Sequence, residues 1–337
     1  MNTFTLIIRS SKQGISQALS SKSFSFCNLA TDTSKTVEMN TIKHTFCLII
    51  LLLTCFFAKA QSSSDLIVLD TKKLFGKFSI IGGSAQLLTD REGYDNQPNF
   101  INDKQVAFSS IDENGNSDII VYSFDTEEFT NMTRTTTKSE FSPRLTDCGK
   151  YISAVTVEED SSQRLWLYPI NFGEPELLYD DIEPVAYYAW HNNIAAMNIL
   201  GEPNELVYPY SRENIAQLAQ NVGNCIQKRP KTSEITYVDK GTSVVLNGKE
   251  TFELKSYDLE EKTAGNYGVA MGQGDDFAWI DKNTLIMAKG QELYIKKVNK
   301  SMEWEKIAVV SMPGYGAISR LAASPAGDKL VLVMERK

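Results

Sequence analysis

Residue types that carry out catalysis or bind metal ions are scarce in this sequence of 337 residues. Only two histidines occur, His44 and His191, although histidine is the side chain that most often serves in acid–base catalysis and metal binding. The sequence has no HExxH, Walker A, GxSxG or GxGxxG motif. His191 follows Trp190 in a predicted turn, where we expect it to face solvent. We therefore predict no catalytic residues, no metal ligands and no cofactor.

Candidate binding residues lie in the segments that lead into six recurring strands. They are polar, acidic and aromatic, a mixture that suits contacts with a peptide, a sugar or a protein. The candidates are Asn96, Gln97, Glu140, Tyr187, Tyr188, Gln273, Asp275, Asp276 and Arg320. We expect these side chains to surround the mouth of a central channel.

The recurring strands belong to an internal repeat of six units. Each unit has two strands joined by a polar turn, and corresponding positions in successive units are 40 to 49 residues apart. The paired strands lie within Pro98–Phe108, Pro143–Ser153, Ala189–Ala196, Lys228–Tyr237, Phe277–Met287 and Leu321–Val331. A period in the mid-forties with short strands is typical of the four-stranded blades of a β-propeller.

Each unit continues with a third strand, in which apolar residues alternate, and with a short fourth strand. The third strands are Asp118–Phe124, Arg164–Pro169, Glu205–Tyr210, Phe252–Tyr257 and Glu292–Lys297. Fourth strands are expected, for example, at Glu127–Thr133 and Glu174–Tyr179. Ser211–Asn221 also fits a helix capped by Ser211, but its place in the repeat favours a fourth strand.

The two ends of the repeat region complement each other. The last unit stops at Lys337 after two strands, whereas a third strand, Asp65–Asp70, and a fourth, within Lys77–Thr89, precede the first unit. Together they would complete one blade and leave no open sheet edge. The predicted fold is therefore all-β: residues 61–337 form a six-bladed β-propeller of four-stranded antiparallel blades, closed by the N-terminal strands. A β-sandwich of hairpins is the alternative.

Residues 39–60 have the pattern of a secretory signal peptide. Lys43 is followed by an apolar run over residues 46–57 and by Ala58-Lys59-Ala60, which predicts cleavage before Gln61. The run is too short for a membrane-spanning helix, which needs roughly 20 residues. We expect a periplasmic or secreted protein with no transmembrane segment in its mature chain, and a non-native or disordered extension at residues 1–38. A lipid anchor on Cys55 is the alternative.

The charge and the cysteine count exclude further classes. The whole chain has a formal net charge of −8, and from Gln61 onward 28 basic and 40 acidic residues leave a net charge of −12. A protein of this charge repels the phosphate backbone of nucleic acids, so we predict no nucleic-acid partner. Only Cys148 and Cys225 remain after Gln61, which excludes a disulfide-rich scaffold and leaves open whether they pair.

Several segments resemble the TolB-like, WD-like repeats of β-propellers from the bacterial cell envelope. They are Glu92–Phe100, Val106–Ser110, Ser117–Tyr122 and Ser319–Val331. The Ala-Lys-Ala-Gln ending of the signal is similar to that of exported proteins of the Bacteroidetes. The resemblance and the scarcity of catalytic groups together favour a monomeric, non-enzymatic propeller that binds a protein or peptide of the cell envelope.

Two other functions remain open. Six-bladed lactonases and gluconolactonases hold calcium in the channel through Glu, Asn and Asp, and Glu140, Asn96 and Asp276 could do the same here. The chain would then be a calcium-dependent lactone or ester hydrolase, or a carbohydrate-active enzyme. Alternatively, the propeller could be an assembly module of an outer-membrane complex, held there through Cys55.

Overall fold

The computed structural model describes residues 63–74, 76–246, 248–300 and 303–337. Every regular element in these ranges is a β-strand, and this part of the chain has no helix long and apolar enough to cross a membrane. The predicted N-terminal extension, the signal peptide and Cys55 lie outside the described residues.

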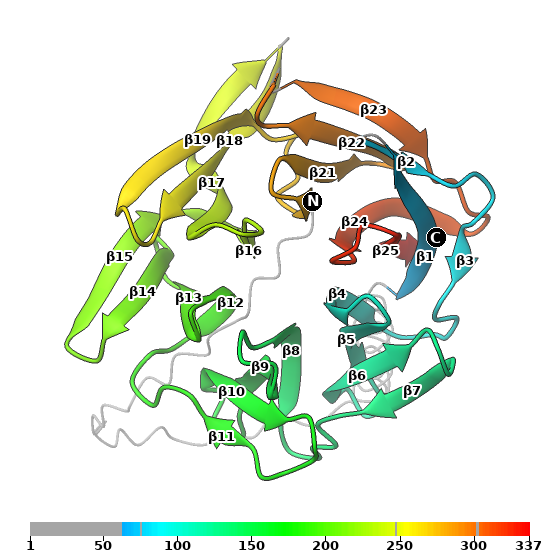
Figure 1. Ribbon diagram of the computed structural model, residues 1–337. Coiled ribbons are helices and arrows are strands. Elements are labelled where there is room, and N and C mark those ends of the chain that lie inside the picture. The colour runs from blue at the N-terminus through cyan, green and yellow to red at the C-terminus, as the bar shows by residue number, and fades with distance from the viewer. Residues whose placement is uncertain (1–62, 75, 247, 301–302) are drawn as a thin grey trace, which may run out of the picture. The chain divides into compact units, whose positions relative to one another are not determined.

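The strands form six antiparallel sheets around a central axis (Figure 1). In blades 1 to 5, four strands follow one another in sequence order from the axis outward, beginning with β4, β8, β12, β16 and β20. The inner strands of the six blades are β4 (Asp95–Asn102), β8 (Ser139–Leu145), β12 (Val185–His191), β16 (Val222–Lys228), β20 (Phe277–Asp281) and β24 (Tyr315–Ala323). The prediction of an all-β, six-bladed propeller is confirmed.

The remaining strands of blades 1 to 5 follow the predicted order. The second strands are β5 (Gln105–Ile111), β9 (Tyr151–Val157), β13 (Ile194–Ile199), β17 (Glu234–Leu246) and β21 (Thr284–Lys289). The third strands are β6 (Ser117–Ser123), β10 (Gln163–Pro169), β14 (Glu205–Ser211), β18 (Lys249–Asp258) and β22 (Glu292–Lys297). The outer strands are β7 (Glu128–Asn131), β11 (Glu176–Leu177), β15 (Asn214–Gln220), β19 (Thr263–Val269) and β23 (Trp304–Val309). Because β15 pairs with β14, the segment that also fitted a helix is a strand.

The sixth blade contains strands from both ends of the described chain. Its sheet has the order β2 (Lys77–Ile80), β1 (Ser64–Leu74), β25 (Lys329–Arg336) and β24, and β3 (Gln86–Leu87) also pairs with β1. β1 and β25 run antiparallel, from Ser64 opposite Glu335 to Asp70 opposite Lys329. The fourth strand expected within residues 77–89 is thus two short strands, each paired with a different part of β1.

Aromatic side chains at equivalent places in the repeat join neighbouring blades. Trp190 on β12 of blade 3 donates a hydrogen bond of 2.9 Å from Nε1 to Ser153 Oγ on β9 of blade 2. Trp279 on β20 of blade 5 donates one of 3.0 Å to Thr236 Oγ1 on β17 of blade 4. Both indole rings are buried, so their large apolar area packs between blades while the N–H finds a partner.

The two cysteines of the propeller do not pair. Cys148 lies exposed in the turn after β8, and Cys225 is buried on β16. Cys225 Sγ donates a hydrogen bond of 3.2 Å to the carbonyl oxygen of Phe277 in blade 5. Burial raises the pKa of the Cys225 thiol to about 12, so this thiol stays protonated and unreactive at neutral pH.

Candidate functional site

A narrow hollow, which we call the channel waist, lies between the inner strands on the axis. It is lined by residues of β4, β8, β12, β16 and β24, and by Asp276, which directly precedes β20. Its polar lining includes Gln97, Arg144, Tyr187, Gln227, Asp276 and Arg320. The volume of the waist is about 40 Å³, which admits only a small group.

Backbone irregularities in two inner strands shape the waist. Gln97 in β4 and Ser142 in β8 have positive φ angles of 57° and 54°, and the pairing with the next strand shifts register at both places. Such bulges redirect side chains that would otherwise alternate regularly. The Gln97 side-chain oxygen accepts hydrogen bonds from the Ser142 backbone N–H at 2.7 Å and from Ser109 Oγ at 3.0 Å, which links blade 1 to blade 2.

An ion pair spans the waist between blades 5 and 6. Arg320 Nη1 lies 3.5 Å from Asp276 Oδ1, and Arg320 Nη2 donates a hydrogen bond of 3.0 Å to Tyr187 Oη. Asp276 Oδ2 also accepts a hydrogen bond of 2.8 Å from the backbone N–H of Leu321. Burial raises the pKa of the Asp276 carboxyl to about 6, although the charge of Arg320 opposes this shift.

A second guanidinium in the waist has no carboxylate partner. Arg144 donates hydrogen bonds of 2.8 Å to the Ile226 carbonyl oxygen and 3.3 Å to Gln227 Oε1, and its guanidinium lies 5.9 Å from the centre of the Tyr188 ring. No carboxylate among the described residues forms an ion pair with it. Burial lowers its pKa, because the charged form loses its hydration.

The waist adjoins a wider hollow, which we call the vestibule, with a volume of about 670 Å³. The two hollows share Asn99 and Gln227 in their linings. The vestibule is formed by the ends of inner strands, which include Lys228 and Asp281, and by the turns that follow β16, β20 and β24, which contribute residues 230–231, 282–283 and 324–326. Its size suits a peptide segment or another ligand of comparable volume.

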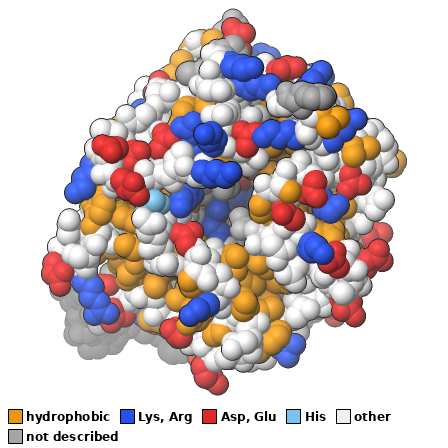
Figure 2. All heavy atoms as spheres, in the orientation of Figure 1, with side chains coloured by type: hydrophobic (Ala, Val, Ile, Leu, Met, Phe, Trp, Pro, Cys, Tyr) orange, Lys and Arg blue, Asp and Glu red, His pale blue; other side chains and the backbone are white. Residues whose placement is uncertain are grey.

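The vestibule is basic, although the protein as a whole is acidic. Among the described residues that line it are four lysines, Lys73, Lys228, Lys231 and Lys282, and one carboxylate, that of Asp281. Lys73 pairs with Asp281, whereas the other three ammonium groups form no ion pair with any described residue. Figure 2 shows Lys and Arg side chains gathered around the central hollow of the face in view. The local potential there attracts anions.

The sequence candidates divide into two groups. Gln97, Tyr187, Tyr188, Asp276 and Arg320 line the waist together. The other four lie outside its lining and have partners of their own. Asn96 donates a hydrogen bond to Ser64 Oγ, and Asp275 accepts one from the Asn224 backbone N–H. The Gln273 carbonyl oxygen accepts a hydrogen bond from Lys240, and Glu140 is buried beside Tyr168. The candidates did not include Arg144, which lies within β8, or the vestibule lysines, which lie in strands or in the turns after them, because the candidates were confined to segments that lead into the inner strands.

Glu140 is a buried carboxyl group in blade 2. Tyr168 donates a hydrogen bond of 3.0 Å to its Oε1, and the Thr135 hydroxyl lies 2.9 Å from its Oε2. Burial raises its pKa to about 7. Of the three residues proposed as calcium ligands, only Asp276 lines the waist, whereas Asn96 and Glu140 lie outside its lining. Within the described ranges, no three His, Cys, Asp or Glu side chains gather as metal ligands.

Glu140→Gln is expected to change how the stability of the protein depends on pH. The folded protein holds the Glu140 proton more tightly than the unfolded chain does, so the stability that this group contributes is full below about pH 4.5 and is lost as the pH rises to about 7. Relative to wild type, the variant should therefore gain about 2 kcal/mol between pH 5 and pH 8. Urea unfolding at both pH values measures this difference, with the exposed Glu128→Gln as control. A constant difference across this range would contradict the assignment.

His191 does not face solvent as we expected from the sequence. It is the last residue of β12, its side chain is buried, and its Nε2 lies 3.4 Å from Glu260 Oε1. Burial and the nearby charge of Lys228 lower its pKa, while Glu260 opposes this effect. The expectation was wrong because β12 extends one residue beyond Trp190, so that the imidazole lies against blade 4, the source of Glu260.

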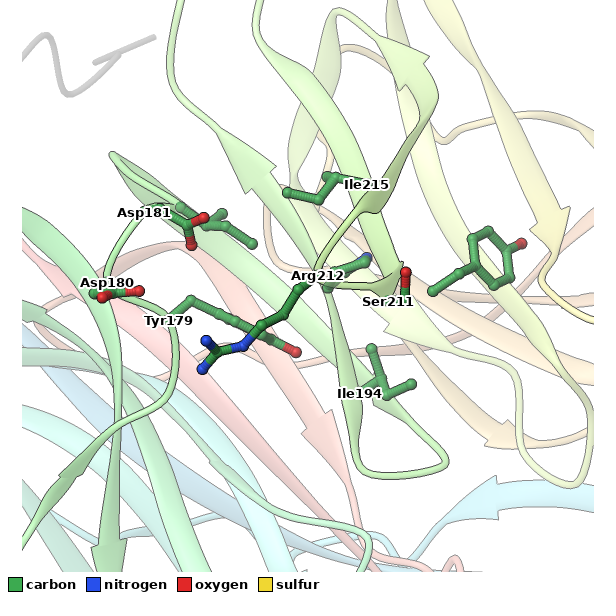
Figure 3. A pocket seen from close by; sticks show the side chains of 10 residues that line it. Tyr179, Asp180, Asp181, Ile194, Ser211, Arg212 and Ile215 are labelled. Carbon is green, nitrogen blue, oxygen red and sulfur yellow. The ribbon is translucent and has the colours of Figure 1, made fainter.

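A separate hollow of about 250 Å³ lies away from the axis, at the outer part of blades 2 and 3 (Figure 3). It is formed by the segment after β11, which includes Tyr179, Asp180 and Asp181, by Ser211 at the end of β14, and by Arg212 in the turn between β14 and β15. Figure 3 shows the Arg212 side chain extending toward Tyr179. None of the residues predicted from the sequence to bind a ligand lies in this hollow.

Comparisons with known proteins bear on the fold. No protein-family model and no curated protein matches the sequence. Among solved structures, putative TolB from Agrobacterium tumefaciens matches with a TM-score of 0.57 and 9% identity, over 82% of this chain and 99% of that one. The chain has a TolB-type propeller fold. TolB from Acinetobacter baumannii matches with a TM-score of 0.50 and 10% identity, over 81% of this chain and 63% of that one.

The TolB-type fold agrees with the resemblance of several sequence segments to TolB-like repeats. This chain spans less than two thirds of the Acinetobacter protein, and at such low identity the likeness concerns the fold alone. An oligogalacturonate lyase from Vibrio parahaemolyticus also matches, with a TM-score of 0.47 and 10% identity over 82% of this chain and 98% of that one.

Proposed function

We propose that this protein is a binding module that holds an acidic segment of a polypeptide partner in the vestibule. The observation that carries this proposal is the lysine-lined hollow of about 670 Å³ at one end of the channel of an otherwise acidic propeller. Lys228, Lys231 and Lys282 lack ion-pair partners among the described residues, so their charges are available to a ligand. Complementary charge of this kind speeds association and selects the partner.

The rest of the lining supports a polypeptide as the ligand. Phe100, Ile280 and Pro325 contribute apolar surface beside the lysines, and such a combination suits a chain that carries both apolar and acidic side chains. Inner strands are also the edge strands of their sheets, and edge strands offer backbone N–H and C=O groups to an extended peptide.

Reversing the charge of the vestibule tests this proposal. A random peptide library displayed on phage is selected against the purified protein, and the affinity of the recovered peptides is measured by titration. We expect acidic peptides, and we expect the combined Lys228→Glu, Lys231→Glu and Lys282→Glu variant to bind them at least about tenfold more weakly.

The matched control reverses three exposed lysines that do not line the vestibule, Lys249, Lys289 and Lys300. This variant has the same net charge as the vestibule variant, and we expect it to bind the selected peptides within about twofold of wild type. Equal losses of affinity in the two variants would show that only the net charge matters, and the proposal would fail. It would also fail if no peptide were selected.

We also propose that the protein acts outside the cytoplasm, since residues 39–60 have the pattern of a secretory signal. Mass spectrometry of the protein purified from its producing cells should find Gln61 as the first residue. A mature chain that begins at a lipid-modified Cys55 would instead support the anchored alternative, and a chain that retains residues 39–60 without modification would contradict export by cleavage.

A further inference from the structure

The channel waist contains an excess of positive charge that the protein itself does not neutralise. Arg144 and Arg320 both line this hollow, together with a single carboxylate, that of Asp276. Asp276 is already engaged, since one of its oxygens faces Arg320 at 3.5 Å and the other accepts the Leu321 backbone N–H at 2.8 Å. Arg144 has only a backbone carbonyl and the Gln227 side chain as hydrogen-bond acceptors.

A guanidinium carries five N–H donors in a planar fork that matches a carboxylate. Two of the donor groups of Arg144 are used by Ile226 and Gln227, and these bonds hold the side chain in place. Tyr188 lies beneath it, with 5.9 Å between the guanidinium carbon and the ring centre. The waist is therefore an ordered site in which an anion would meet two arginines at a small cost in side-chain entropy.

The position of the waist restricts which anion can reach it. It adjoins the vestibule through Asn99 and Gln227, so a ligand held by the lysines has access to it. Its volume of about 40 Å³ is too small for a polypeptide to pass through but admits an end group.

We infer that the waist binds the terminal carboxylate of the partner polypeptide, with Arg144 as its principal ligand and Arg320 beside it. This inference rests on the proposed function, because the vestibule must hold the rest of the segment. It makes the protein selective for free carboxyl termini, whereas the vestibule lysines alone would accept an acidic segment from the middle of a chain.

Two forms of one probe test the inference. The probe is a fluorescein-labelled pool of hexapeptides in which three positions are Asp or Glu, synthesised once with a free carboxyl terminus and once with a terminal amide. We expect the wild-type protein to bind the free acid at least about tenfold more tightly than the amide, and this comparison needs no variant. In Arg144→Gln, we expect the two forms to bind with equal affinity, close to that of the amide in wild type.

Lys282→Gln provides the contrasting variant. It should weaken the binding of both forms by a similar factor and preserve the preference for the free acid, because Lys282 lies in the vestibule and not in the waist. If wild type binds both forms equally while the vestibule lysines still matter, the carboxyl-terminus inference is overturned and the proposed function stands. If wild type binds neither form, both fail. A preference for the free acid that survives Arg144→Gln in folded protein would also overturn the role of Arg144.

Discussion

Asp65→Ala is expected to lower the free energy of unfolding by about 3 kcal/mol. The Asp65 carboxylate is fully buried in blade 6 and accepts hydrogen bonds from Arg336 Nε at 2.5 Å and from Tyr315 Oη at 2.8 Å. It thus joins β1 to β25 and β24, the strands from the other end of the chain. Alanine would leave the buried Tyr315 hydroxyl without this acceptor, would remove the acceptor of the buried Thr89 hydroxyl, and would leave the half-buried Arg336 with Asp90 alone.

Asp70→Ala is the matched control on the same strand. Asp70 pairs with Lys329 of β25 at 2.9 Å, but its side chain is 49% exposed, and exposed ion pairs contribute less than about 1 kcal/mol. Urea unfolding of both variants gives the comparison, with the denaturant dependence checked for a common slope. If the two variants were destabilised equally, the burial of Asp65 and its bonds to Tyr315 and Arg336 would contribute no more than an exposed ion pair, and this prediction would be wrong.

Trp190→Ala is expected to lower the free energy of unfolding by about 3 to 5 kcal/mol. The indole is buried between blades 2 and 3, where it packs with a cluster that includes Val155, Leu165 and Met197. Its removal would leave a cavity and would take the hydrogen-bond donor from Ser153. Trp190→Phe fills much of the same space and should cost less than half as much.

Phe172→Ala serves as the control for this second prediction, because Phe172 is 55% exposed at the surface of blade 2 and its loss should change stability by about 0.5 kcal/mol or less. Thermal and urea unfolding of the three variants measure the effects. A loss in Trp190→Ala no larger than that in Phe172→Ala would contradict the role of the tryptophan in joining blades.

Much of the fold could be predicted from the sequence because the repeat supplies many independent copies of one pattern. The segment Ser211–Asn221 is an example. Its local sequence also fitted a helix, but its place in the repeat predicted a strand, and the structure has the strand β15 there. The pairing of β1 with β25 was likewise predictable, because Asp65–Asp70 reads as a third strand without a second strand before it, and Lys329–Met334 as a second strand without a third strand after it.

The site was less predictable, because its shape depends on features that a periodic pattern does not contain. The bulges at Gln97 and Ser142 interrupt the alternation of β4 and β8, and although a proline follows each of them, the proline alone does not give the direction in which the neighbouring side chains turn. The vestibule is formed by segments of several blades that come together only in the folded ring, so the sequence did not distinguish Lys231 and Lys282 from ordinary turn residues. The prediction that His191 faces solvent was wrong for a related reason. Its side chain is buried against blade 4, which contains Glu260, and contacts between blades are not part of the repeat pattern.

The central claim is that the vestibule holds the partner, and site-specific photo-crosslinking in cells tests it most directly. A benzoylphenylalanine placed at the exposed position of Lys282 lies in the vestibule lining, and one at Lys249 lies on the tip of the β17–β18 hairpin. We predict one dominant adduct from position 282, with the crosslink in an acidic segment of the partner, and no comparable adduct from position 249. The same adduct from both positions, or none from position 282, would contradict the claim.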